Sequence, residues 1–280
     1  MSEQQHQFLF ISPHYDDAVL SCASTLMELQ QRGHSCQVLT IFGGYPPLPF
    51  RASEIARQYA AEDLGLPEAE IDESHFSLLV ALRYQEDCQA FQQLGAVRHE
   101  VLPFPDAIYR GEDEQAYYET EEELFGIPHQ LDEESLLPQI AKSLMSYDKH
   151  QNHIWAFPAV SNHVDHQLLT KLGTAMLSLG YRVLFYAEFP YWQQDHQFSE
   201  DGWVQADVKS SVYYPAKLTA VLEYKTQLLG LFGEHAESGI RNGEIIPELE
   251  RFWIREADES LFRLFGSLGP SPLQPTTTER

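Results

Sequence analysis

The feature that most constrains this chain is the turn that follows its first apolar run. Residues Phe8 to Ile11 are rich in β-forming side chains, which predicts a strand, and an amphipathic run begins at Ala18. Between them lies Ser12-Pro13-His14-Tyr15-Asp16-Asp17. One histidine and two adjacent carboxylates are therefore expected on a strand-to-helix turn. In an open α/β sheet, ligands gather just outside the carboxyl ends of the strands, so this turn is a candidate site.

A histidine and a carboxylate three residues apart on such a turn can reach one divalent ion. Imidazole nitrogen and carboxylate oxygen are a common ligand set of catalytic zinc. His14 and Asp17 have this spacing, but the stretch offers no third ligand. The alternative is that Asp16 or Asp17 only caps the following helix and that His14 has no role. The hexapeptide alone leaves both interpretations open.

The rest of the pattern predicts an α/β fold with a mostly parallel sheet. Val38 to Phe42 is almost continuously apolar, which is typical of a parallel strand buried on both faces. With the first strand and the helix between them, it forms a right-handed strand–helix–strand crossover. Further strands are expected at 97–102, 153–157 and 183–187, and helices at 18–32, 52–64, 79–94, 131–145, 168–179 and 216–229.

The length and composition are sufficient for one large domain. The chain has 280 residues, 43% of them hydrophobic, and contains no internal repeat or convincing linker. We therefore expect a single domain over residues 1–266, followed by a loose Pro- and Thr-rich tail at 267–280. The segment 112–123 is acidic and is expected to be a solvated insertion.

The charge of the chain argues against several classes of partner. Lys and Arg number 18 and Asp and Glu number 42, which gives a net charge of −24. Such a surface repels the phosphates of nucleic acids and of anionic lipids, so we expect neither as a partner. The three cysteines are scattered, and no signal peptide or membrane-spanning run is recognisable. We expect a cytoplasmic protein with a small-molecule substrate, and whether it forms a homo-oligomer is left open.

A second constellation of the same kind follows the strand expected at 153–157. It reads Pro158-Ala159-Val160-Ser161-Asn162-His163-Val164-Asp165-His166 and leads into a helix. Parallel topology places both turns at one edge of the sheet. His14, Asp17 and His166 can then complete a two-His, one-carboxylate zinc site with an exchangeable fourth position. The alternative is that the histidines of this turn are surface or internally satisfied residues, but two such turns in matching places favour the joint site.

Together the two motifs resemble those of the PIG-L/LmbE-like zinc-dependent de-N-acetylases, in their bacterial branch. That family carries Pro-His-x-Asp-Asp after its first strand and His-x-Asp-His much later. Here they stand as Pro13-His14-Tyr15-Asp16-Asp17 and His163-Val164-Asp165-His166, and the resemblance covers most of residues 7–230. It implies a Rossmann-like, three-layer α/β/α fold. One departure is Ala18, where many members have Glu, and it can alter the shape of the pocket.

The resemblance also implies roles for individual residues. The implied zinc ligands are His14, Asp17 and His166, and Fe²⁺ or another divalent metal is an alternative to Zn²⁺. Asp16 resembles the general base, a role that suits it because neighbouring side chains on a turn diverge. His163 resembles the residue that steadies the oxyanion, as a positively charged imidazole, or protonates the leaving amine. The remaining implied site residues are Asp165, which orients one of these histidines, and Arg83 and Asp106, which contact the sugar.

Several residues around the expected site allow two interpretations. Arg83 has the acidic neighbours Glu86 and Asp87 on its own helix and can pair with one of them instead of a substrate. Tyr191 and Trp192 follow the strand expected at 183–187, and they can stack on a sugar ring or pack in the core. The loops 43–51 and 103–110 leave the same edge of the sheet and are expected to border the metal.

These features predict a zinc-dependent hydrolase that removes the N-acetyl group from an N-acetylated amino sugar or N-acetylglucosamine conjugate. The expected nucleophile is a zinc-activated water, with Asp16 as the general base. A first alternative is a metal-dependent hydrolase of another small amide or ester. A second is a non-catalytic small-molecule-binding protein on the same fold, and the intact Asp16 argues against it.

Overall fold

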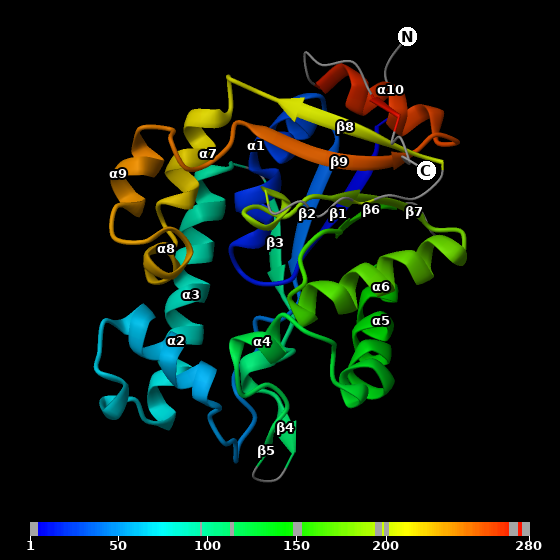
Figure 1. Ribbon diagram of the computed structural model, residues 1–280. Helices are drawn as coiled ribbons and strands as arrows, with labels where there is room; N and C mark the ends of the chain where they lie inside the picture. The colour runs from blue at the N-terminus through cyan, green and yellow to red at the C-terminus, as the bar shows by residue number, and fades with distance from the viewer. Residues whose placement is uncertain are drawn as a thin grey trace.

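The computed structural model describes residues 5–95, 97–112, 115–147, 153–193, 198, 202–268 and 274–275. Its centre is an eight-stranded sheet with the order β10-β8-β9-β7-β6-β1-β2-β3 (Figure 1). The strands β3-β2-β1-β6-β7 are parallel to one another, and β9 joins them antiparallel to β7. The strands are β1 (Gln7–Ser12), β2 (Ser35–Thr40), β3 (Arg98–Val101), β6 (His153–Pro158), β7 (Arg182–Tyr186), β8 (Trp203–Lys209), β9 (Leu249–Arg255) and β10 (Gln274–Pro275).

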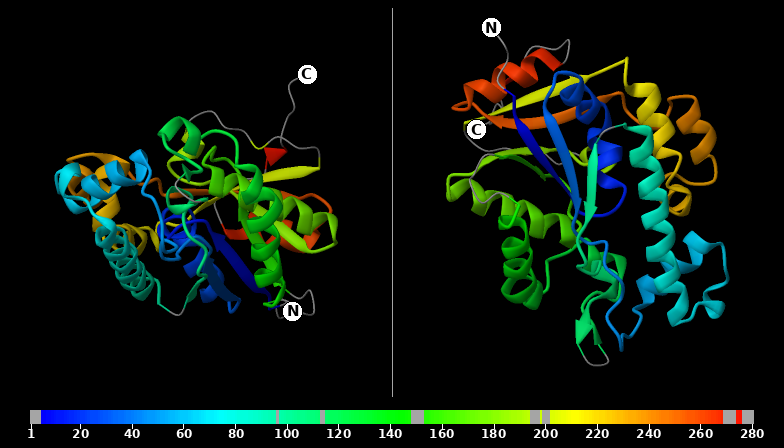
Figure 2. Two further views of the ribbon diagram at one scale, coloured as in Figure 1. Left: turned by 90° about the horizontal axis from the view of Figure 1, so that it is seen from below. Right: turned by 180° about the vertical axis from the view of Figure 1, so that it is seen from behind.

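Helices cover both faces of this sheet, which gives three layers (Figures 1 and 2). Helices α1, α3, α7 and α10 pack on one face, and α5 and α6 pack on the other. The predicted α/β class and the mostly parallel sheet are confirmed. The helices are α1 (Asp17–Gln31), α2 (Glu54–Leu64), α3 (Glu73–Gln93), α4 (Glu121–Leu124), α5 (Leu137–Met145), α6 (Val164–Ser178), α7 (Tyr214–Val221), α8 (Lys225–Phe232), α9 (Ala236–Arg241) and α10 (Glu259–Leu268).

Strand β1 lies in the middle of the parallel part and is buried on both faces, as its apolar run predicts. Phe8 and Phe10 belong to the core beneath α1 and α3, whereas Leu9 and Ile11 belong to the core beneath α5 and α6. The alternation follows from the two-residue period of a strand. Strand β1 has no exposed face, and it places the polar turn that follows it at the carboxyl ends of the parallel strands.

Three predicted helices differ from the observed ones. Helix α3 begins at Glu73, earlier than expected, because Asp72 caps it and accepts the N–H of Ser74. The segment expected at 131–145 starts as a π-helical turn, and α5 begins one residue before Pro138. The single helix expected at 216–229 is wrong: α7 and α8 are separate, and the buried Tyr224 at the break donates a 2.7 Å hydrogen bond to Asp87.

Two long strands, β8 and β9, were not predicted from the sequence. They pair antiparallel along their full length and extend the sheet beyond β7. The expected tail at 267–280 lies largely outside the described residues; of its described part, 267–268 end α10 and 274–275 pair with β8. The acidic segment 112–123 contains the hairpin strand β5 (Gln115–Ala116), which pairs with β4 (Gly111–Glu112), and the start of α4, and residues 113–114 lie outside the described part. Among the described helices, none has the length and apolar character needed to cross a membrane.

Candidate active site

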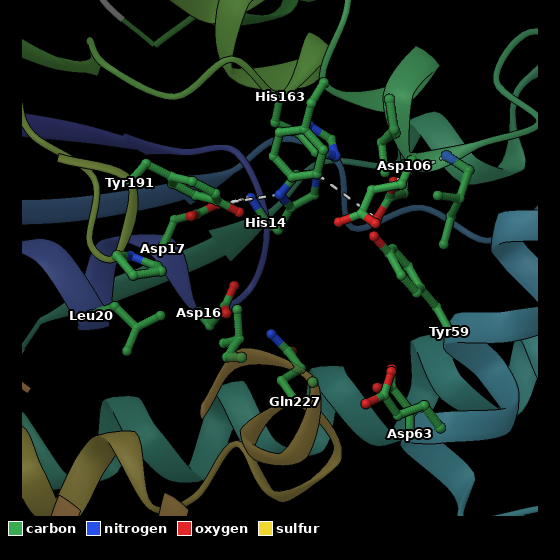
Figure 3. A pocket seen from close by; sticks show the side chains of 18 of the residues that line it. His14, Asp16, Asp17, Leu20, Tyr59, Asp63, Asp106, His163, Tyr191 and Gln227 are labelled. Atoms are coloured by element: carbon green, nitrogen blue, oxygen red, sulfur yellow. Dashed lines mark hydrogen bonds and ion pairs between the residues drawn. The ribbon is translucent and has the colours of Figure 1, made fainter. Parts of the chain in front are cut away.

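The two polar turns meet at one edge of the sheet, as their topology predicts (Figure 3). His14 and Asp165, which are 151 residues apart in the sequence, are in direct contact. The ring centroid of His14 lies 4.9 Å from that of His163 and 5.4 Å from that of His166. The β1–α1 turn carries His14 and Asp16 and leads into α1 at Asp17, and the β6–α6 turn ends at the cap His163, with Asp165 and His166 in the first turn of α6; below, each turn is named together with these helix residues.

Hydrogen bonds within the β1–α1 turn hold its shape. Ser12 Oγ donates to the carbonyl oxygen of His14 at 2.6 Å and accepts the N–H of Ala18 at 3.0 Å. The backbone N–H of His14 donates to Asp17 Oδ2 at 2.9 Å. The adjacent carboxylates then diverge: Asp17 lies beside His14, whereas Asp16 points toward Gln227 (Figure 3). This divergence is what the sequence predicts for two neighbours on a turn.

The Asp17 carboxylate lies between two imidazole rings. Its Oδ2 atom is 3.3 Å from Nδ1 of His14 and 3.4 Å from Nε2 of His166. Burial alone would raise the pKa of Asp17, but the two neighbouring imidazoles and the N–H of His14 hold it below the usual value. The two histidines predicted to bind one ion therefore both lie beside Oδ2 of Asp17, the third predicted ligand.

Each of these two imidazoles is backed by a second buried carboxylate. Nε2 of His14 lies 3.2 Å from Asp165 Oδ2, and Nδ1 of His166 lies 3.0 Å from Glu188 Oε1. Nε2 of His166 is buried and makes no hydrogen bond to any residue that the structure describes. A carboxylate behind the outer nitrogen of an imidazole is the usual arrangement around a metal-binding histidine.

Two groups of side chains bring their ligand atoms within 4.8 Å of one another. One consists of His14, His163 and His166, and the other of His14, Asp106 and Asp165. The predicted set of His14, Asp17 and His166 is not one of these groups, although Asp17 contacts both histidines. His163 therefore lies beside the candidate ligands, and Asp17 stays one of them because it contacts both histidines.

Asp16 has the character of a base that works near neutral pH. Burial and the charge of Asp17 raise the pKa of Asp16 to about 6, while a hydrogen bond from Gln227 opposes that shift. Its side chain lines the same cavity as the histidines. A carboxylate with this pKa is mostly ionised at pH 7 and can still release a proton that it has taken up.

His163 is neutral in this arrangement, which differs from the positively charged imidazole expected from the sequence. Burial and the nearby charge of His14 lower the pKa of His163 well below its usual value. Its Nδ1 accepts the backbone N–H of Asp165 at 3.2 Å and caps α6, so Nε2 carries the ring proton. His163 can therefore donate one hydrogen bond from Nε2 but has no charge to contribute.

The Asp165 carboxylate contacts His14 and a buried arginine. Its Oδ1 lies 2.6 Å from the guanidinium of Arg110, and its Oδ2 accepts the N–H of Ala107 at 3.0 Å. Burial would raise the pKa of Asp165, but Arg110 and His14 hold it below the usual value. Only the backbone of Asp165 is hydrogen-bonded to His163, so the histidine that this carboxylate orients is His14.

Arg83 and Asp106 both line the cavity. Arg83 forms an ion pair with Asp63 of α2, whereas its helix neighbours Glu86 and Asp87 bind other elements, so Arg83 is paired, but not within its own helix as the alternative interpretation had it. Asp106 Oδ2 lies 3.8 Å from Nε2 of His14. Of the two residues expected to contact sugar, Arg83 is thus already paired with Asp63, and Asp106 lies beside His14.

Of the two aromatic residues that follow β7, only Tyr191 lines the cavity. Its ring centroid lies 5.4 Å from that of His166, whereas Trp192 packs against the hydrophobic cores and beneath Arg251. Glu188 and Gln227 belong to neither motif, and the sequence predicts no role for them. Glu188 comes directly after the strand expected at 183–187, and this position at the edge of the sheet was the signal that could have identified it.

The cavity has a volume of about 640 Å³ and an acidic lining. Six carboxylates line it against one arginine: Asp16, Asp17, Glu62, Asp63, Asp106 and Glu121, with Arg83. Loop 103–110 contributes Asp106 and Ile108, as expected, but no residue of loop 43–51 is among those that line it. Loop 43–51 packs away from the cavity because Gly44 donates to the carbonyl of Phe104 at 2.8 Å and Gly43 accepts the hydroxyl of Tyr15.

Comparison with known proteins gives matches over most of the chain. The model of the GlcNAc-PI de-N-acetylase family (PIG-L) matches residues 9–177. The 2'-N-acetylparomamine deacetylase of Niallia circulans is 59% identical over 274 residues, which cover 98% of this chain and 100% of that protein. A deacetylase–teicoplanin complex from the biosynthesis of teicoplanin is 26% identical, with a TM-score of 0.65, and the match covers 89% of this chain and 98% of that one. The A40926 pseudoaglycone deacetylase Dbv21 shares the fold at 23% identity and a TM-score of 0.65, over 99% of this chain and 100% of that one.

Proposed function

Because the chain belongs to the PIG-L family of de-N-acetylases, we propose that it hydrolyses the N-acetyl group of an amino sugar that carries further free amino groups, such as 2'-N-acetylparomamine. The chain is an N-deacetylase. The observation that carries the substrate class is the 59% identity, over 98% of the chain, with a deacetylase of that compound. A cytoplasmic location and the oligomeric state stay predictions.

We assign the metal site to His14, Asp17 and His166, with His163 beside it. The fit is supported by the buried Nε2 of His166, which makes no hydrogen bond to a described residue and lies 3.4 Å from Asp17. It is also supported by the carboxylates behind both imidazoles. Two imidazoles and one carboxylate suit Zn²⁺, and Fe²⁺ accepts the same donors. Such an ion, when bound, lowers the pKa of a water molecule and polarises the acetyl oxygen.

We assign the proton transfers to Asp16. It accepts a proton from the attacking water as the water oxygen bonds to the acetyl carbon, and it returns that proton to the amine nitrogen as the C–N bond breaks. The products are the free amine and acetic acid, which ionises to acetate at neutral pH. Its raised pKa, about 6, supports both steps, because the group is ionised at neutral pH yet holds a proton long enough to deliver it.

We assign a neutral donor role to His163. Its Nε2–H can donate a hydrogen bond to the acetyl oxygen as negative charge develops there, which is the role of an oxyanion-hole donor. Protonation of the leaving amine, the other role that the sequence suggests, is less suitable for an imidazole whose pKa is lowered by burial. Asp16 is the better proton donor.

The acidic lining supports a cationic substrate. Beyond Asp16 and Asp17, the carboxylates of Glu62, Asp63 and Glu121 line the cavity, and Arg83, the only arginine among the described residues that line it, is paired with Asp63. Ammonium groups on the substrate complement this potential, whereas a phosphate group is repelled. The lining thus favours an amino sugar with free amines over the phosphoinositide conjugate in the family's name.

The test is acetate release from a substrate panel by the purified, metal-loaded chain. We expect the order 2'-N-acetylparomamine, then N-acetylglucosamine, with simple acetamides and GlcNAc-phosphatidylinositol slowest. Equal kcat/KM for simple acetamides would favour the alternative of a general amide hydrolase. Removal of the metal by a chelator should abolish release, and restoration by Zn²⁺ or Fe²⁺ identifies the better metal.

A further inference from the structure

Glu188 lies two residues after the end of β7, with its side chain fully buried against the β6–α6 turn. We propose that Glu188 is a positioning residue that sets the orientation and proton position of the His166 ring, so that its Nε2 presents a free lone pair beside Asp17 and the site binds a divalent metal tightly. The proposal rests on the metal site proposed above. Glu188 belongs to neither of the two motifs.

Four donors converge on the two oxygens of this carboxylate. Oε1 lies 3.0 Å from Nδ1 of His166 and accepts the N–H of Ser161 at 3.2 Å. Oε2 accepts the N–H of Ala159 at 2.8 Å and that of Val160 at 2.9 Å. An ionised carboxylate offers only acceptors, so it satisfies all four donors at once.

The contact with Glu188 determines which nitrogen of His166 carries the proton. Only Nδ1 is hydrogen-bonded to a carboxylate, at 3.0 Å from Glu188 Oε1, so in the neutral ring the proton lies on Nδ1 and the lone pair on Nε2. Nε2 is buried, lies 3.4 Å from Asp17 Oδ2 and makes no hydrogen bond to a described residue. The lone pair is therefore oriented toward the candidate metal site before any ion binds.

Glu188 also holds the backbone segment that leads to His163 and His166. Its three backbone partners, residues 159–161, end two positions before the His163 cap of α6. On the other side of the site, Asp165 backs His14 in the same way. Glu188 differs in that one side chain holds both the imidazole and the turn that carries it.

Replacement of Glu188 by Gln tests the role with almost no change of shape. In glutamine, an NH₂ group replaces one of the two carboxylate oxygens. In either orientation of the amide, this NH₂ group faces two hydrogen-bond donors and cannot accept from them. We expect the zinc affinity of Glu188→Gln, measured on the full chain by competition with a chelating dye, to fall by about 10–100-fold, as for other partners of metal-binding histidines. The matched control is Glu250→Gln, a buried carboxylate that accepts two backbone N–H groups from α1 and pairs with Lys217.

A second readout does not depend on metal. Long-range ¹H–¹⁵N NMR of the metal-free chain reports the tautomer of His166, and we expect Nδ1–H in the wild type and in Glu250→Gln. In Glu188→Gln we expect the Nε2–H form to appear, because the amide can donate to Nδ1. A general loss of stability would not move the proton between the two nitrogens.

The outcomes separate this proposal from the one on which it rests. A wild-type chain that binds no zinc would overturn the metal site itself. A wild type that binds zinc while Glu188→Gln binds it equally well with the same tautomer, or while Glu250→Gln is weakened as much, overturns only the role of Glu188. If Glu188→Gln does not fold, Glu188→Asp replaces it: its carboxylate is one methylene shorter, so weaker zinc binding supports the proposal and wild-type affinity contradicts it.

Discussion

The two turns that form the candidate active site are alike in sequence but are held in different ways. The β1–α1 turn is closed by bonds among its own residues, from Ser12 to His14 and Ala18 and from His14 to Asp17. The β6–α6 turn also depends on charged groups from elsewhere in the chain, Glu188 after β7 and Arg110 of loop 103–110. Both motifs can be recognised from a short stretch, whereas the distant charged residues that hold the second one cannot.

The two turns also differ in the pKa shifts of their carboxylates. In the first turn, two carboxylates diverge, and burial with the charge of Asp17 raises the pKa of Asp16 to about 6. In the second turn, buried Arg110 and His14 hold the pKa of Asp165 low. We therefore expect the first turn to provide the proton transfer and the second to provide a fixed framework around a shared ion.

Substitution of a metal ligand in either turn should have the largest effect. His166→Ala and Asp17→Asn each remove one proposed ligand, so both should lose most bound metal and more than about 10⁴-fold in kcat/KM, beyond the range for loss of a general base. Metal content by mass spectrometry and circular dichroism of the folded variants check this. Full metal occupancy in His166→Ala would show that the two turns do not share one ion.

Asp16→Asn should affect turnover while leaving metal in place. The variant keeps the shape of the side chain but removes its basicity, so we expect a loss of about 10²–10⁴-fold in kcat. Metal content, measured beside Asp17→Asn, should stay near the wild-type value. If Asp16→Asn lost its metal as completely as Asp17→Asn, the proposed division between the two adjacent carboxylates would be wrong.

Removal of the buried arginine tests whether the second turn needs its distant partners. Arg110→Met leaves the carboxylates of Asp165 and Asp132 buried without their cation. We expect a loss of about 3–5 kcal/mol in the free energy of unfolding, measured by denaturant titration. The reference is Arg263→Met, an exposed arginine paired with Glu259 on α10, where we expect less than about 0.5 kcal/mol. Equal losses in the two variants would contradict a framework role for Arg110.

The parts of the fold that the sequence predicts are those with an uninterrupted local pattern. The parallel strands β1, β6 and β7 are apolar runs, and each was expected close to its observed position, whereas β2 was expected at 38–42 and begins earlier, at the polar Ser35. Strand β9 was missed because its pattern is broken by Glu250, which is buried in an ion pair with Lys217 and reads as a surface residue. A charge that is neutralised by a residue 33 positions away carries no local signal of its burial.

The same limit applies to the candidate site. All six residues of the two motifs lie together, because strand topology alone brings the turns to one edge. The sequence could not show that Asp165 would contact His14 instead of His163, nor that Arg83 would pair with Asp63. These contacts depend on side-chain directions and on the packing of α2 against α3, neither of which follows from spacing along the chain.

The smallest expected effect concerns the exposed part of the lining, which neither turn provides. Glu62 of α2 and Glu121 of α4 are exposed carboxylates that line the cavity. We expect Glu62→Gln combined with Glu121→Gln to raise KM for 2'-N-acetylparomamine by about 2- to 5-fold, because an exposed charge pair contributes at most about 1 kcal/mol. The kcat value should not change, since neither residue belongs to the two turns, and KM for neutral N-acetylglucosamine should also stay constant.

The matched control is Glu68→Gln combined with Glu122→Gln, which removes the same charge from exposed positions that do not line the cavity. Steady-state kinetics at low and high salt decide the matter: the KM difference should shrink with salt, because screening weakens exposed charges. A change in kcat, or an equal change in KM for the neutral sugar, would place these carboxylates in catalysis or folding instead of substrate selection.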